Sequence, residues 1–395
     1  MDILELIGRK RELFSIDIEN NQLEIDRLVS SSHFLVIGGA GSIGKAVVKE
    51  IFKRNPLKLH VVDISENNLV ELVRDLRSTY GYIDGDFRTF ALDAGSKIYD
   101  AFIKSDGEYD YVLNLSALKH VRSEKDPYTL MRMLEVNVLN TIKTVEQSIA
   151  NGAKKYFCVS TDKAANPVNL MGASKRIMEM YLVDLGKQIS ISSARFANVA
   201  FSDGSLLHSF EERLKQNHPI VAPNDVKRYF VTPRESGILC LMSCLFGENG
   251  EIYFPKLDEN EHLVSFTEIA DKFLLEKGYQ PVYCHSEEEA RTSVMELKKE
   301  KKWPCFYSSS DTTGEKAFEE FYTQDENITL DTYIDLGIVK QNLSVDKNLL
   351  TGFQQSISSM IDRSSWSKEE LIDLFHSLLP DLDYEDKGKY LDAKM

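Results

Sequence analysis

The sequence predicts a doubly wound α/β fold with a parallel sheet, and three observations support that class. Short strand-like runs recur at 34–37, 59–62, 90–93, 111–117, 155–159 and 191–199, and several are continuously apolar, as buried parallel strands are. Segments with apolar residues at helical spacing separate them, and a glycine-rich loop follows the first run. Strands that alternate with helices in this way form a parallel sheet covered on both faces.

Length and composition indicate a globular protein of two domains, or of one large domain with a lobe. The 395 residues carry a formal net charge of −15, which disfavours a general nucleic-acid binder because phosphate contacts require a basic surface. Five cysteines argue against a disulfide framework. No apolar run approaches the roughly 18 residues that span a bilayer, and the start does not resemble a signal peptide. We therefore expect a cytoplasmic protein without a membrane span.

Two segments are interpreted as structural. Residues 1–30 have apolar positions at helical spacing among many charges, which predicts an amphipathic leader packed on its own chain or on a sister subunit. Cys240 and Cys244 share one face of an apolar, helix-like run, and no second cysteine pair or histidine cluster accompanies them. Core packing explains them better than zinc binding does, and we expect no metal site.

The loop at 38–44 is the first indication of function. Its glycines stand at intervals of three, G-x-x-G-x-x-G, a variant of the dinucleotide fingerprint G-x-G-x-x-G. The second strand ends at Asp63, where a carboxylate can bind the adenine ribose hydroxyls and repel a 2′-phosphate, so NAD is favoured over NADP. At the end of the third strand, Asp93 lies where folds of this type commonly reach adenine. The expected cofactor contacts are Gly38, Gly41, Ser42, Ile43, Gly44, Asp63 and Asp93.

The stretch 160–175 is the candidate catalytic segment. It follows the strand at 155–159 and leads into a helix expected at 175–185, so Thr161, Asp162 and Lys163 come where a buried strand ends. In an open α/β sheet, ligands bind at this carboxyl edge. An adjacent acid and amine could move protons on a substrate placed over them.

The second half of the chain is expected to add a substrate lobe. We place the NAD-binding domain at 31–195 with later segments returning to it, the lobe at 196–330 and a helical extension at 331–395. Lys227 and Arg228 are a basic exception in an acidic protein and suit a phosphate partner. An exposed helix or loop is expected at 285–303, and a further helix from 311 that bears Phe318 and Phe321.

Several motifs resemble the polysaccharide-biosynthesis branch of the extended short-chain dehydrogenase/reductases. They are the glycine loop, Ser116-Ala117-Leu118-Lys119-His120-Val121, Ser160-Thr161-Asp162-Lys163-Ala164, Asn169-Leu170-Met171-Gly172-Ala173-Ser174-Lys175 and Gly314-Glu315-Lys316. Within that branch the chain is most similar to UDP-N-acetylglucosamine 4,6-dehydratases, and among these to the soluble enzymes of legionaminic acid synthesis. The motifs that carry the resemblance lie within residues 30–330. The rest of the chain is similar only in overall length and in having a C-terminal extension of the same kind.

The resemblance implies a hydro-lyase that removes water across C5 and C6 of the sugar. Bound NAD would oxidise C4, which acidifies the C5 hydrogen, and would return the hydride to C6. Lys163 suits the base at C5 if desolvation and neighbouring charge lower its pKa. Asp162 suits the acid at the C6 oxygen, and Thr161 suits a hydrogen bond to the C4 oxygen. Bacterial surface-sugar synthesis, of the legionaminic acid or bacillosamine type, is the implied setting.

Met171 departs from the wider superfamily, where a Tyr four residues before the Lys takes the C4 hydroxyl proton. Some dehydratases of this branch resemble the chain in carrying Met there, and our hypothesis is that Asp162 takes that proton and passes it to the C6 oxygen. Lys175 would hold the nicotinamide ribose. By analogy, Ala117 would contact the cofactor, and the nucleotide-sugar contacts would be Lys119, His120, Asn198 and Arg228.

Alternative functions stay open at this point. A 4-epimerase or ketoreductase of the same fold fits the region from Gly38 to Asp63 but is expected to carry Tyr at position 171. A nucleotide-binding regulatory protein without activity is a third interpretation, and the presence of Asp162, Lys163 and Lys175 speaks against it. The sequence leaves open UDP against GDP and retention against inversion at C5. A homodimer or larger homo-oligomer is the expected assembly.

Overall fold

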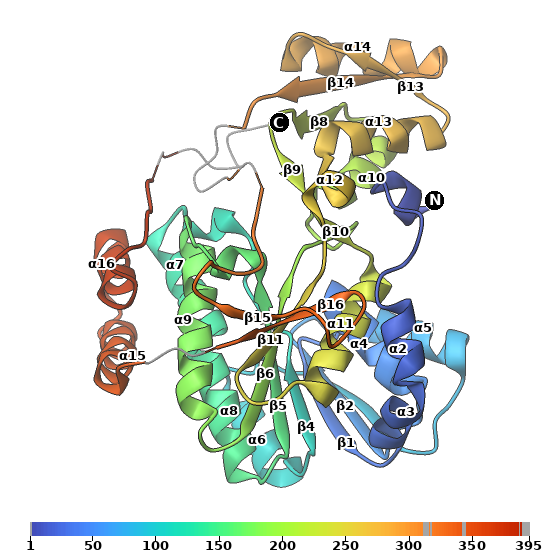
Figure 1. The fold of residues 1–395 in the computed structure, drawn as a ribbon. Coiled ribbons are helices and arrows are strands. Elements are labelled where there is room, and N and C mark those ends of the chain that lie inside the picture. The colour runs from blue at the N-terminus through green and yellow to red at the C-terminus, as the bar shows by residue number, and fades with distance from the viewer. Residues whose placement is uncertain (1, 311–315, 317, 342–344, 387, 389–395) are drawn as a thin grey trace.

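The computed structural model describes residues 2–310, 316, 318–341, 345–386 and 388. Its centre is a nine-stranded sheet in the order β15-β16-β11-β6-β5-β4-β1-β2-β3 (Figure 1). The strands from β3 to β11 pair in parallel, while β16 and β15 add antiparallel pairings at one edge. The doubly wound class is confirmed. The strands are β1 (His33–Ile37), β2 (Lys58–Asp63), β3 (Asp86–Ala91), β4 (Tyr111–Asn114), β5 (Lys155–Thr161), β6 (Ser190–Phe196), β11 (Glu251–Pro255), β15 (Asn327–Thr329) and β16 (Leu336–Lys340).

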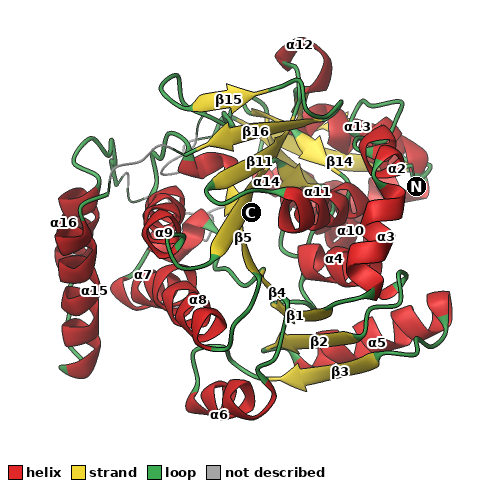
Figure 2. Cartoon of the chain, turned by 60° about the horizontal axis from the view of Figure 1, so that its bottom comes forward, coloured by secondary structure: helices red, strands yellow, loops and turns green. Residues whose placement is uncertain are grey.

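Helices cover both faces of this sheet (Figure 2). One face carries α4 (Ser42–Phe52), α5 (Glu66–Tyr80) and α11 (Pro233–Phe246), and the other carries α6 (Lys97–Asp106), α7 (Pro127–Leu134), α8 (Asn140–Ala150) and α9 (Leu170–Leu185). Cys240 and Cys244 lie on α11 inside the first core, which confirms that they pack apolar surface.

The strand order reverses between β1 and β4. From β1 the chain builds outward through β2 and β3, and from β4 it builds in the other direction through β5 and β6. Loops that leave the carboxyl ends of β1 and β4 therefore diverge, and this is where open α/β sheets bind ligands.

A smaller lobe lies beyond the carboxyl edge of the sheet (Figure 1). Its parallel sheet comprises β8 (Ile220–Pro223), β14 (Lys302–Ser308) and β13 (Gln280–Tyr283), and its helices are α10 (Leu206–Gln216), α12 (Glu259–His262), α13 (Phe266–Glu276) and α14 (Glu287–Lys299). Phe210, Phe273 and Trp303 fill its own apolar core. Two short pairings adjoin it, β7 (Asn198–Val199) with β10 (Phe230–Val231) and β9 (Lys227–Arg228) with β12 (Val264–Ser265).

The leader packs on its own chain and links the two cores. Leu6, the last residue of α1 (Ile3–Leu6), lies in the core of the lobe. Phe14, which precedes α2 (Ser15–Asn20), and Ile25 of α3 (Gln22–Ser30) lie in a core of the central domain. Between them, the buried Arg9 forms an ion pair with Glu235 of α11 at 2.5 Å. The leader therefore bridges lobe and sheet.

The C-terminal region differs from the sequence-based expectation in two places. Residues 327–340, which span the expected boundary at 331, supply β15 and β16 of the central sheet, because an antiparallel strand can still pair at the β11 edge. The described residues 318–322 are not helical, and 311–315 and 317 lie outside the described part. The helices α15 (Lys347–Asp362) and α16 (Lys368–Leu378) then pack outside α7 and α9 (Figure 2).

No helix in the described ranges combines the length and apolar character that a bilayer crossing requires.

Candidate active site

The glycine loop lies tightly against the chain that leaves β4. Gly38 has φ +74°, and a Cβ there would lie 2.6 Å from the Ser116 amide nitrogen. A Cβ at Gly44 would collide with the Gly38 carbonyl oxygen. Glycine is therefore sterically required at both positions. Gly41 is different, because its φ of −73° is ordinary and its nearest neighbour would lie at 3.6 Å.

The N-terminus of α4 begins directly in this loop. Its N-cap is Gly41, and no side chain caps its first amides. Such a helix end favours an anion such as a pyrophosphate. The hydroxyl of Ser42 accepts a hydrogen bond at 2.8 Å from the Asp203 amide, which draws the loop at 201–205 toward the helix end. Ser42 and Ile43, which were expected to contact the cofactor, thus occupy the first turn of α4.

Two acidic residues lie at the carboxyl ends of neighbouring strands: Asp63 is the last residue of β2, and Asp93 comes two residues after β3. Asp63 accepts hydrogen bonds at 2.9 Å from the Ala40 and Ser65 amides, so it braces the glycine loop in addition to ending β2. Each carboxylate oxygen retains a second lone pair for a ribose hydroxyl. Asp93 forms an ion pair with Arg132 at 2.9 Å. Its pKa is lowered, because the Gly95 amide and Arg132 together outweigh desolvation.

Asn137 fastens the loop that carries Ala117 and Lys119. Its side-chain oxygen accepts from the Leu118 amide at 3.0 Å, and its amide nitrogen donates to the Leu118 carbonyl and to the Ser174 hydroxyl of α9. The sequence pattern predicts one long helix from Met131 to Ala150 that contains Asn137. In the structure a π-helical turn, Glu135–Leu139, interrupts that helix, and Asn137 belongs to this turn. Such turns are frequent at functional sites. Sequence reasoning noted Asn137 but assigned it no role.

The expected substrate residues Lys119 and His120 face the loop at 201–205. A Cβ on Gly204 would lie 3.0 Å from Nε2 of His120. Both side chains are exposed at this edge. Partial desolvation lowers the pKa of the Lys119 amine, and the Asp203 carboxylate opposes this.

Thr161, Asp162 and Lys163 come together where β5 ends. The Asp162 carboxylate is buried, and its Oδ1 accepts from the Thr161 hydroxyl and the Lys163 amide at 2.8 Å and from the Lys163 amine at 3.1 Å. The Lys163 amine lies 3.7 Å from Oε1 of Glu319, another buried carboxyl group, which sequence reasoning missed. The site is therefore a triad of Asp162, Lys163 and Glu319.

The charge state of Lys163 differs from the expectation that its pKa would be lowered. Burial does lower the pKa of the amine, but the carboxylates of Asp162 and Glu319 act in the opposite direction and more strongly, so the net pKa is raised. Burial also raises the pKa of Glu319. The triad holds Lys163 as an ammonium ion.

Helix α9 packs directly against the triad. A Cβ on Gly172 would collide with the Lys163 carbonyl oxygen, so this close approach requires glycine. Lys175 is buried one turn later and donates to the Val159 carbonyl at 3.1 Å, and burial lowers its pKa. Met171 is buried in the first turn, where its amide donates to Oε1 of Glu124 at 2.9 Å.

The basic residue of the lobe reaches the same place. Arg228 is buried and donates to the Lys316 carbonyl at 2.9 Å, and its charge acts on both Lys163 and Glu319. Asn198 lies on β7, whose partner β10 begins two residues after Arg228. The structure thus brings Arg228 to the triad. Gly314 and Glu315 of the matched motif lie outside the described residues.

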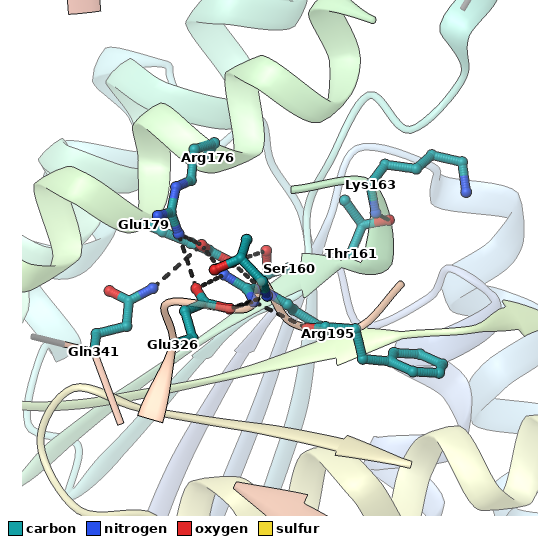
Figure 3. Close-up of polar contacts among 10 residues, drawn as sticks. Ser160, Thr161, Lys163, Arg176, Glu179, Arg195, Glu326 and Gln341 are labelled. Atoms are coloured by element: carbon teal, nitrogen blue, oxygen red, sulfur yellow. Dashed lines mark hydrogen bonds and ion pairs between the residues drawn. The ribbon is translucent and has the colours of Figure 1, made fainter. Parts of the chain in front are cut away.

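A second charge cluster, which we call the Arg195 cluster, joins side chains of β5, β6 and α9 (Figure 3). Arg195 has no exposed side-chain surface and forms ion pairs with Glu179 at 2.8 Å and with Glu326 at 2.6 Å. Three further polar side chains complete the cluster: Ser160, Arg176 and Gln341. In Figure 3, Lys163 points away from the Arg195 cluster. A charged residue inside the strand run at 191–199 was the sequence signal for it.

Comparison with known proteins places the chain in a family. A family model described as "Polysaccharide biosynthesis protein" matches residues 34–340. The chain is 31% identical over 80% of its length, and over 88% of the relative, to "Uncharacterized membrane protein MJ1061" of Methanocaldococcus jannaschii. It is 29% identical over 64% of its length to "Capsular polysaccharide biosynthesis protein CapD" of Staphylococcus aureus, of which it spans 41%.

Two relatives with named reactions are more distant. The chain is 26% identical over 58% of its length to "UDP-N-acetylglucosamine 4,6-dehydratase (inverting)" of Campylobacter jejuni and spans 68% of that enzyme. It is 27% identical over 56% of its length to "UDP-glucose 4-epimerase" of Rickettsia bellii and spans 65% of it.

Solved structures share the fold. Pen from Bacillus thuringiensis aligns with a TM-score of 0.66 and 23% identity, covering 81% of this chain and 90% of the other. DesIV of Streptomyces venezuelae, a dTDP-glucose 4,6-dehydratase, aligns with a TM-score of 0.52 and 17% identity, covering 70% and 88%. The family model spans most of the sheet, the lobe and the triad. On this evidence, the chain belongs to the polysaccharide biosynthesis protein family.

Proposed function

We propose that the protein is an NAD-dependent nucleotide-sugar 4,6-dehydratase that acts on UDP-N-acetylglucosamine. The observation that carries the proposal is the hydrogen-bonded acid and amine of Asp162 and Lys163, held at the carboxyl end of β5 beside α9. The Campylobacter relative named for this reaction supports the substrate and chemistry. Synthesis of a surface sugar of the legionaminic acid or bacillosamine type, in the cytoplasm and by a homo-oligomer, is part of the proposal.

The residues present fit a dinucleotide cofactor. The loop at 38–44 leaves no room for a Cβ at Gly38 or Gly44, and the first amides of α4 have no side-chain cap. These amides would bind the pyrophosphate, and Asp63 would accept from the adenine ribose hydroxyls, which favours NAD over NADP. Asp93 and Ala117 would flank the adenosine and nicotinamide portions, and Lys175 would bind the nicotinamide ribose.

When bound, the nicotinamide would supply a reversible hydride acceptor, so that C4 becomes the ketone that the product keeps and the same hydride later reduces C6. The side chains of this chain move the protons. Asp162 would take the C4 hydroxyl proton and later protonate the departing C6 oxygen, while Thr161 would orient the C4 oxygen. Lys163 would remove the C5 proton that the ketone has acidified.

Lys163 can act as a base only after its ammonium group has lost a proton. Because Asp162 and Glu319 raise the pKa of this amine, the unprotonated form is scarce at low pH. We therefore expect turnover to rise with pH. On the substrate side, Lys119, His120, Asn198 and Arg228 would contact the nucleotide sugar from the carboxyl edge and the lobe at 196–330.

A 4-epimerase is the second candidate, and the Rickettsia relative supports it. Epimerisation at C4 needs the hydride step and a group that takes the C4 hydroxyl proton, but no base at C5 and no acid at C6. It therefore leaves Lys163 without a role and uses only part of the role proposed for Asp162.

One incubation separates the candidates. Protein supplied with NAD and UDP-N-acetylglucosamine is followed by proton NMR in heavy water. A 4-keto-6-deoxy sugar with solvent deuterium at C5 supports the dehydratase and the base at Lys163. A C4 epimer without deoxygenation would establish the second candidate instead, and an unchanged sugar would contradict both.

A further inference from the structure

Glu319 is a buried acidic residue to which the proposed reaction assigns no step. Its side chain is 3% exposed, and its Oε1 faces the Lys163 amine at 3.7 Å. That distance is too long for a hydrogen bond but lies within the range of an ion pair. Glu319 therefore acts on Lys163 through its charge. Asp162 acts through its charge and also orients the amine, because its Oδ1 accepts a hydrogen bond from that amine at 3.1 Å.

The chain around Glu319 is fastened on both sides. On one side, the Lys316 carbonyl accepts from Arg228, the Lys316 amine donates to the Asn166 carbonyl at 2.5 Å, and the Asn166 amide donates to Glu320 at 2.8 Å. On the other side, the Phe321 carbonyl accepts from Arg195 at 2.9 Å. The Arg195 cluster thus anchors the segment that delivers Glu319 to the triad.

We propose that Glu319 is a positioning residue that holds the Lys163 amine in place and sets its affinity for protons. The charged groups that face Lys163 are Asp162 from its own turn, Glu319, and Arg228 from β9. Lys316 also faces Glu319. Two anionic side chains, Asp162 and Glu319, thus stabilise the ammonium form of Lys163, and Arg228 opposes them. Removing one of the anions weakens the electrostatic stabilisation of that ammonium form.

The expected direction follows from the charges. Glu319→Gln keeps the shape of the side chain but removes a negative charge 3.7 Å from the amine, so the ammonium form is less stable and the Lys163 pKa falls. For a pair buried to this extent we expect a fall of roughly one pH unit or more. The effect of this pKa change on catalysis rests on the proposed function, whereas the change in the titration of Lys163 does not.

The test measures the titration of Lys163 directly. Only unprotonated amines react with acetic anhydride, so trace acetylation of the full-length protein at a series of pH values, with peptide mapping of Lys163, reports its pKa. Glu319→Gln should move this curve to lower pH. Glu320→Gln is the matched control, because Glu320 is exposed and adjacent and a glutamine oxygen can still accept from the Asn166 amide. Its curve should overlay that of the unmodified protein. Superimposable curves for Glu319→Gln and the unmodified protein would overturn the inference.

Activity adds a second, separable readout. Glu319→Gln should move the acid limb of the kcat/KM profile to lower pH and reduce the plateau severalfold, because a weaker base abstracts a proton less readily. A shifted acetylation curve in a protein without dehydratase activity retains the inference and removes the proposed function. Dehydratase activity together with an unshifted acetylation curve retains the proposed function and overturns the inference about Glu319. If Glu319→Gln fails to fold, Glu319→Asp should give a smaller shift in the same direction, and no shift in that variant overturns the proposal.

Discussion

Two buried charge clusters lie near the carboxyl end of β5, and they differ in how completely their hydrogen bonds are satisfied. In the Arg195 cluster, one guanidinium forms ion pairs with two carboxylates, and the pKa of Glu179 falls to about 2 because the charge and hydrogen bonds of Arg195 outweigh burial. In the triad, one amine faces two carboxylates, with a single hydrogen bond at 3.1 Å and an ion pair at 3.7 Å.

The two clusters differ in how many hydrogen-bond donors they leave for a ligand. An arginine fork that bonds two carboxylates has little to offer a ligand, and breaking such a buried pair mainly affects stability. A lysine amine has three donors on a flexible stem. The Lys163 amine contacts Asp162 at 3.1 Å and Glu319 only at 3.7 Å, and the side chain keeps 17% of its surface exposed. Burial of charge alone therefore does not distinguish the proposed active site from a structural cluster. The incomplete satisfaction of the triad supports placing the proposed chemistry there.

The largest expected effect is on turnover at the triad. Lys163→Met removes the base, and we expect turnover to fall by about 10²- to 10⁴-fold, the usual contribution of general acid–base catalysis. Asp162 retains its bonds to the Thr161 hydroxyl and the main-chain amide, so folding and NAD binding should persist. NMR product assays with a measurement of bound NAD check this, and a fully active variant would break the comparison.

The next effect is on stability at the Arg195 cluster. Arg195→Met leaves Glu179 and Glu326 buried without their main cation, and we expect the free energy of unfolding to fall by about 3–5 kcal/mol. Denaturant titration measures this. Arg176→Met is the matched control, because Arg176 is partly exposed and contacts the same carboxylates at longer distances, and its loss should be smaller. Equal losses in both variants would contradict the central role of Arg195.

Glu124 is a buried carboxyl group outside both clusters, and it accepts a hydrogen bond from the Met171 amide of α9 at 2.9 Å. Burial raises its pKa from 4.5 to about 7. The folded protein then binds this proton more tightly than the unfolded chain does. The associated stability is present below pH 4.5 and is lost as pH rises through about 7.

Glu124→Gln should remove this pH dependence, since the amide is neutral throughout. The shift corresponds to roughly 3 kcal/mol, so we expect the variant to unfold at a higher temperature than the unmodified protein above pH 7 and at a similar temperature near pH 4. Thermal unfolding across this range is the measurement. A constant difference at every pH would show that Glu124 does not titrate in this window.

The smallest expected effect is within the triad. Thr161→Val removes the hydroxyl that donates to Asp162 at 2.8 Å, while the two bonds from Lys163 remain. A hydrogen bond to a charged acceptor is worth roughly 1.5–3 kcal/mol. Because the other two bonds to Asp162 remain, we expect the low end of that range and a fall in turnover of about tenfold. Steady-state assays against an unchanged denaturation midpoint check the prediction. A loss as large as that of Lys163→Met would mean that Thr161 takes part in proton transfer.

Much of the fold was predictable from local pattern, and the exceptions have physical causes. The runs at 34–37 and 59–62 became β1 and β2 with small changes at their ends, because parallel strands buried on both faces must be continuously apolar. The interruption of the 131–150 helix at Glu135–Leu139 was not predictable, since a π-turn depends on what its side chains reach, here Leu118 and Ser174. The expected helix near 318–322 failed because this segment instead spans from Arg228 to Arg195.

By itself, the sequence determined the sheet class, the glycine loop and the adjacency of Asp162 to Lys163, because each depends on residue type and spacing within a short stretch. Tertiary structure alone decided that Glu319 lies against Lys163, more than 150 residues away in the chain, and that the pKa of this amine is raised. Proton affinity depends on charges summed over distance in space, and only the folded chain defines those distances.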